Sequence, residues 1–213
     1  MYDALDAAET AQQAESGRAR RLAVTSTVMA PVRHDYSGLG EMAAILTNGD
    51  PSAVAMARGL SLDPEVFRGR HSTWADKHLT GVTDAHQFRI IAFAHWVMGK
   101  GRRRKYGAFI PAEHTLAHIL PKLEYTVKDL QFPVDLQNVD APRDLPAAEA
   151  LQALHDHLTG QGAHLVALRT DGTCGTDCQK TDGYHVFIVP DVDMCRLMQV
   201  ADAAGFQFTE HFA

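Results

Sequence analysis

Two cysteines in a glycine-rich stretch have a spacing that suits metal chemistry. Cys174 and Cys178 lie four positions apart in segment 171–178, DGTCGTDC. Zn²⁺ prefers thiolate and imidazole ligands, so the two cysteines with His185, or with another histidine, would supply three or four tetrahedral ligands. A single Cys-x3-Cys lacks the second ligand pair of a complete zinc motif, and a polar loop or a reversible disulfide explains the same spacing. Zinc is the one cofactor that the sequence suggests.

A second pattern with metal-ligand spacing is Glu113-His114-x-x-x-His118. On a helix, the i and i+4 spacing would place both imidazoles on one face, as a shared metal requires. The zinc-protease motif needs a glutamate directly after its first histidine, and Thr115 occupies that position. Surface or interface histidines are the alternative interpretation.

His185 interrupts an apolar run of strand length, YHVFIV. Strand alternation directs it to the side opposite Tyr184, where a hydrogen-bonded structural histidine is the simplest expectation. A catalytic role would need a nucleophile or carboxylate nearby, and Asp182, Tyr184 or Cys178 would have to provide it. The chain has no linear motif of a serine hydrolase, a dinucleotide-binding enzyme or a P-loop NTPase, so no catalytic residue is predicted.

Five positive charges occur within six residues near the middle of the chain. They are Lys100, Arg102, Arg103, Arg104 and Lys105. Such a cluster can bind an anion, an acidic protein or nucleic acid, although it also suits the solvated end of a helix. We expect these residues to form the partner-binding or anion-binding site.

Helical signals dominate the part of the chain before Pro121. Asp84 is a good N-cap for a helix with a wide apolar face, Gly99 and Gly101 end that helix, and a further helix is expected over 112–120. After Pro121 we expect a strand within 123–136. The first half is therefore predicted to be mostly helical.

The C-terminal part alternates between helical and strand patterns. A helix opened by Asp144 and Pro146 and closed by Gly160 precedes two strands, 164–170 and 184–189, that suit a hairpin. A helix after Asp191, stopped by Gly205, and a strand over 206–209 complete the order βαββαβ. We predict an α+β protein with a flexible arm (1–20), a helical region (21–121) and a ferredoxin-like domain (122–213).

The segment Asp182-Gly183-Tyr184-His185-Val186-Phe187-Ile188-Val189 resembles the Asp-x-Tyr-His-x-Phe-x-Val hairpin motif of an uncharacterised bacterial domain family. The resemblance extends over about residues 80–210 and departs from the family pattern by a cysteine-containing insertion between the hairpin strands. It implies a fold and no catalytic residue.

Charge and cysteine content restrict the class of function. The net charge of −6 disfavours nucleic acid and anionic membranes as general partners, and no stretch approaches the length of a transmembrane helix. Three cysteines suit a reducing compartment, so we expect a cytoplasmic location. We therefore expect a non-catalytic protein-binding module, such as an immunity or antitoxin-like protein that binds a toxin. A zinc protein or metal-dependent hydrolase, and a nucleic-acid-binding protein using residues 100–105, are the alternatives; the sequence does not specify the oligomeric state.

Overall fold

The computed structural model describes residues 33–79, 81–100, 106–169 and 183–212. The chain divides into two compact units, Met1–Arg33 and His34–Ala213. Every helix and strand named below belongs to the second unit.

The described residues between 36 and 100 are mostly helical. Asp50, Asp63 and Asp84 each accept hydrogen bonds from backbone N–H groups at the start of the next helix, and Pro51 and Pro64 follow two of these caps. The elements are η1 (Tyr36–Gly38), α2 (Leu39–Leu46), α3 (Pro51–Leu62), α4 (Pro64–Arg70), α5 (Ser72–His78), α6 (Ala85–Ile91) and the π-helix η2 (Ala92–Lys100).

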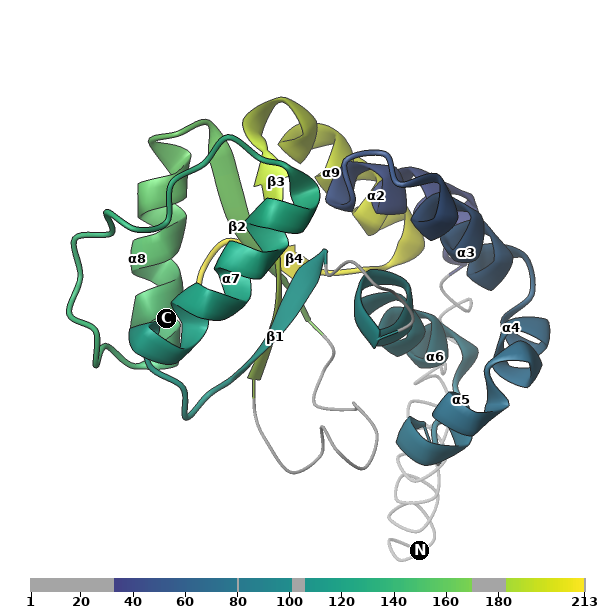
Figure 1. The fold of residues 1–213 in the computed structure, drawn as a ribbon. Helices are drawn as coiled ribbons and strands as arrows, with labels where there is room; N and C mark the ends of the chain where they lie inside the picture. The colour runs from purple at the N-terminus through teal and green to yellow at the C-terminus, as the bar shows by residue number, and fades with distance from the viewer. Residues whose placement is uncertain (1–32, 80, 101–105, 170–182, 213) are drawn as a thin grey trace, which may run out of the picture. The chain divides into compact units, whose positions relative to one another are not determined.

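A four-stranded antiparallel sheet follows, with three longer helices. The strands are β1 (Gly107–Pro111), β2 (Ala163–Leu168), β3 (Gly183–Pro190) and β4 (Phe208–Thr209), in the order β1-β3-β2-β4. The helices are α7 (Leu116–Leu130), α8 (Ala147–Thr159) and α9 (Asp191–Ala204). Helices α7 and α8 cover one face of the sheet, and α9 with α2 covers the other (Figure 1). The expected pairing of the two strands around the 170–182 segment is confirmed, with His164 opposite Val189.

The structure is α+β, as predicted, but it does not confirm the ferredoxin-like topology. In the ferredoxin-like βαββαβ arrangement the last strand lies beside the first, whereas here β4 pairs with β2, at the edge of the sheet opposite β1. The strand expected within 123–136 is wrong, because α7 continues through Pro121 to Leu130. Its buried face, which includes Ile119 and Leu123, continues on both sides of the proline. The fourth strand is instead β1, upstream of α7.

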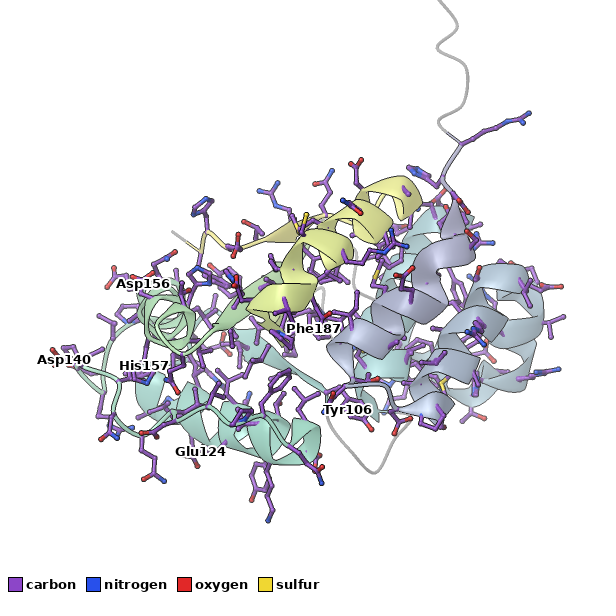
Figure 2. All side chains as sticks on the ribbon, turned by 90° about the horizontal axis from the view of Figure 1, so that it is seen from above. Tyr106, Glu124, Asp140, Asp156, His157 and Phe187 are labelled. Carbon is purple, nitrogen blue, oxygen red and sulfur yellow. The ribbon has the colours of Figure 1, made fainter. Side chains whose placement is uncertain are left out.

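One hydrophobic core joins the helical region and the sheet. Residues from before and after residue 121 belong to the same buried cluster, and Figure 2 shows Phe187 of β3 within the mass of side chains. Tyr106, 1% exposed, donates a hydrogen bond of 2.5 Å from its hydroxyl to Asp50 Oδ2 and so ties the start of β1 to the cap of α3. The division into 21–121 and 122–213 remains a prediction, and α7 spans its boundary. Within the described ranges, no helix has the length and apolarity to cross a membrane.

Candidate metal centre

Two histidines and a glutamate from three separate segments converge beside the outer edge of β2. His155 lies near the end of α8, His164 near the start of β2, and Glu210 directly after β4. One potential ligand atom from each of the three side chains lies within 4.8 Å of the others. The two imidazoles are largely buried, with 13% and 16% of their side chains exposed, whereas Glu210 is 34% exposed. The cluster is therefore partly shielded from water and open on the carboxylate side.

The backbone of β2 fixes the proton position on His155. Its Nδ1 lies 2.9 Å from the carbonyl oxygen of Leu165, and a carbonyl only accepts hydrogen bonds, so Nδ1 carries the proton. In the neutral ring, Nε2 then carries the lone pair, and it lies 3.9 Å from Glu210 Oε1. A metal-binding histidine usually donates its other ring N–H to a carbonyl or carboxylate in this way.

The Leu165 carbonyl is available because β4 is short. The N–H of Arg169 donates to Gln207 on the β4 side of β2, and alternate residues of a strand direct their backbone groups to the same side. The Leu165 carbonyl therefore faces that side too. The last described pair between β2 and β4 is Ala167 with Thr209, so Leu165 lies beyond the end of the pairing and its carbonyl accepts from His155 instead.

His164 lies between two carboxylates. Its Nδ1 is 2.6 Å from Glu210 Oε1, and its Nε2 is 2.9 Å from Asp191 Oδ1 at the first residue of α9. Partial burial alone would lower the pKa of His164, but the hydrogen bonds and negative charges of Asp191 and Glu210 outweigh it and raise the pKa. Both ring nitrogens therefore face carboxylate oxygens, an arrangement that stabilises the doubly protonated form.

The three groups fit a metal ion with a small adjustment. Ligands about 2.1 Å from a tetrahedral ion lie about 3.4 Å apart. The 3.9 Å between His155 Nε2 and Glu210 Oε1 is close to that spacing, whereas the 2.6 Å hydrogen bond from His164 Nδ1 to Glu210 would have to lengthen. An ion would replace the Nδ1 proton. Asp191 would then hold the remaining Nε2–H, which gives both histidines a hydrogen-bond acceptor behind the metal.

The metal site predicted from sequence is only partly described. Cys174 and Cys178 lie outside the described residues. His185 is 4% exposed in β3, and its ring lies against His95 and Phe109, at 4.4 and 4.8 Å between ring centroids. Its Nε2 has no hydrogen-bond partner among the described residues. Burial, with a smaller contribution from His95, lowers the pKa of His185 to about 3, so the ring is neutral.

The paired-histidine pattern at 113–118 has a structural role. Helix α7 begins at Leu116, so His114 precedes the helix, but its ring still lies near that of His118, with 5.2 Å between the ring centroids. His118 Nδ1 lies 2.9 Å from the Thr115 hydroxyl in a capping box, and His114 Nδ1 lies 3.4 Å from the Lys122 ammonium. Burial, followed by the positive charges of Lys122 and His118, lowers the pKa of His114. A neighbouring ammonium also disfavours a bound cation.

Most of the basic cluster that we expect to bind a partner or an anion lies outside the described residues. Arg102, Arg103, Arg104 and Lys105 lie outside the described residues, and only the backbone of Lys100 is described, at the end of η2.

Sequence reasoning missed the candidate metal centre because its members are far apart in the chain and share no spacing. One signal was present: the hairpin pairing places His164 opposite Val189, two residues before Asp191, and so predicts that His164 and Asp191 lie at the same end of the sheet. His155 and Glu210 join them only through packing of α8 and through the short β4.

Searches with family models, and comparisons with curated proteins and with solved structures, find no match to this chain.

Proposed function

We propose that this protein binds Zn²⁺ through His155, His164 and Glu210. The observation that carries the proposal is the convergence of the three ligand atoms within 4.8 Å, with Leu165 and Asp191 accepting the two outward ring N–H groups. Two imidazoles and one carboxylate form a known ligand set of catalytic zinc sites, in which a water molecule occupies the fourth position. The partly exposed Glu210 side would admit that water.

Zinc content provides the direct test. Protein purified without a histidine tag in reducing buffer should bind about one equivalent of Zn²⁺ by elemental analysis and by calorimetric titration. His155→Gln, His164→Gln and Glu210→Gln should each weaken binding, because each removes one ligand. His157→Gln is the matched control: His157, labelled in Figure 2, lies two residues further along α8 and is partly exposed, with Nε2 2.8 Å from the carbonyl oxygen of Asp135.

The cysteine site of the sequence analysis gives the competing outcome. If zinc binding survives His164→Gln and disappears in a Cys174→Ser, Cys178→Ser double variant, the zinc site is the cysteine loop and our proposal is wrong. Absence of binding to the unaltered protein would exclude both sites.

The other functions expected from the sequence remain predictions. A protein partner or nucleic acid at residues 100–105 depends on side chains outside the described ranges. A cytoplasmic location remains a proposal that is based on cysteine content; Cys195 is a free, exposed thiol.

A further inference from the structure

A cavity of about 410 Å³ lies between the start of α6, the end of α9 and the ends of the β2–β4 ribbon. Its lining includes His34, His86, Arg169, Asp202 and Phe206. The volume is within the range of about 300–1,000 Å³ that is common for small-ligand sites. None of the three candidate zinc ligands lines it, so it is a separate site.

One wall of the cavity consists of aromatic rings that pack against one another. The rings of His34 and His86 are stacked, with centroids 4.0 Å apart, and the Tyr36 hydroxyl lies 2.8 Å from His86 Nδ1. Gly205 permits this arrangement, because a Cβ at that position would overlap His34 Nδ1. Phe206 meets the His86 ring edge-on. The wall therefore offers flat aromatic surface without rearrangement of the backbone.

Two residues of opposite charge, Arg169 and Asp202, line the same cavity. Neither Arg169 nor Asp202 forms an ion pair with its side chain in the described part of the chain. Asp84, the other acidic residue of the lining, already uses one carboxylate oxygen to cap α6, at 2.7 Å from the N–H of Gln87. Asp202 has no side-chain hydrogen bond in the described part of the chain, so we take it, with Arg169, as the charged pair that a ligand would meet.

We propose that this cavity binds a small zwitterion of the α-amino acid class, with its carboxylate on Arg169 and its ammonium on Asp202. An arginine fork matches a carboxylate through two parallel hydrogen bonds, and a carboxylate accepts from an ammonium. A ligand with only one charge would be repelled by one of the two side chains: an anion by Asp202, or a cation by Arg169. The stacked imidazoles and Phe206 favour an apolar or aromatic side chain on the ligand.

The test is titration of the full-length protein with each of the twenty standard amino acids by saturation-transfer NMR, followed by calorimetry of the best binder. That amino acid is then compared with its decarboxylated amine and its deaminated acid, which each lack one charge. Arg169→Gln and Asp202→Asn should each weaken binding about tenfold or more, the usual effect of losing one charge-assisted hydrogen bond. Arg143→Gln and Asp140→Asn are matched controls at exposed positions outside the cavity lining, and should have no effect; Figure 2 shows Asp140 on the outside of the molecule.

Binding that requires both ligand charges and both side chains supports the proposal. It is overturned if no amino acid binds, if either single-charge analogue binds as tightly as the amino acid, or if the two cavity variants bind like the controls. Thermal unfolding of each variant verifies that it is folded. His164→Gln should leave amino-acid affinity unchanged, so failure of the zinc proposal and failure of this one are separate results.

Discussion

His164 and His185 lie on the paired strands β2 and β3, and their surroundings shift the two pKa values in opposite directions. His164 meets two carboxylates at the sheet edge, and its pKa is raised. His185 lies in the core against His95, and its pKa is lowered to about 3. The charged form of the same side chain is therefore stabilised at one end of the hairpin and destabilised at the other.

Burial of His185 should make the protein less stable in mild acid. The unfolded chain takes up this proton below about pH 6.5, whereas the folded chain takes it up only near pH 3, so stability is complete above 6.5 and is lost as the pH falls. Between pH 7 and pH 5 the expected loss from this residue is about 2 kcal/mol.

Urea unfolding at pH 7 and pH 5 measures this loss. His185→Leu should show a smaller loss over the same interval, because its side chain does not titrate. Other histidines with a lowered pKa, including His71 and His86, are present in both proteins, so the difference between the two reports on His185 alone. Equal pH dependence in the two proteins would contradict the assignment.

The raised pKa of His164 should depend on both carboxylates. Asp191→Asn and Glu210→Gln should each lower it, because each removes a negative charge and a hydrogen bond to the protonated ring. The histidine resonances of metal-free protein, followed by NMR against pH, measure the change. Asp193→Asn, in the same first turn of α9, is the control.

The sign of the resulting stability effect is opposite to that of His185. Since the folded-state pKa of His164 is above its unfolded value, its interactions contribute fully below about pH 6.5 and are lost as the pH rises through the raised pKa. If the pKa of His164 were unchanged in both carboxylate variants, its ring would not be held by hydrogen bonds to Asp191 and Glu210.

Among the elements, helix ends were easier to predict than strand identities. Asp84 caps α6 and Gly205 ends α9, because a carboxylate cap and a left-handed residue act within one turn of chain. Pro121 was interpreted as a stop, yet α7 passes through it, since packing of its apolar face outweighs the lost hydrogen bond. Strand β1, only five residues long, becomes a strand through its pairing with β3, which is distant in sequence.

The end of α9 should be sensitive to a single methyl group. Gly205 has φ of 73°, which costs an L-residue about 1–2 kcal/mol, and an added Cβ would also overlap the His34 ring. Gly205→Ala should therefore lower the free energy of unfolding by more than that amount. Gly59→Ala, inside α3 with no atom within 4 Å of the new Cβ, should instead raise it by about 0.5–1 kcal/mol.

Chemical denaturation of the two alanine variants beside the unaltered protein measures both effects. If both alanine variants changed the free energy of unfolding by the same amount and in the same direction, the conformational argument would be contradicted.

At the scale of the whole molecule, the unit His34–Ala213 should fold as one body. Its core includes residues from both sides of position 121, and β3 needs β1 on one side and β2 on the other. A fragment of residues 122–213 lacks β1, η2 and the start of α7, and so exposes the core around Phe187. We expect this fragment to show no cooperative unfolding, whereas a fragment of residues 34–213 should unfold in one transition followed by circular dichroism. Cooperative unfolding of the shorter fragment would support the sequence-derived boundary instead.

The fold class and most helices could be predicted from the sequence, whereas the two candidate sites could not. The apolar spacing of Leu151, Leu154 and Leu158 defines α8 locally, because helical periodicity is a property of neighbouring residues. The convergence of His155, His164 and Glu210 depends on which strands pair and where β4 ends, and no local pattern encodes that. The same holds for Arg169 and Asp202, which reach one cavity from different elements.

The hydrogen bond between His155 and Leu165 has a further consequence for association between copies of the chain. An unpaired carbonyl at a sheet edge is a starting point for a strand from another molecule, which can lead to aggregation. The His155 ring occupies the Leu165 carbonyl where β4 leaves that edge unprotected. His155→Leu should therefore aggregate faster than His157→Leu in light-scattering measurements at equal concentration, in the absence of added metal. In the metal-free protein, this imidazole blocks strand addition at the same edge where it would bind zinc.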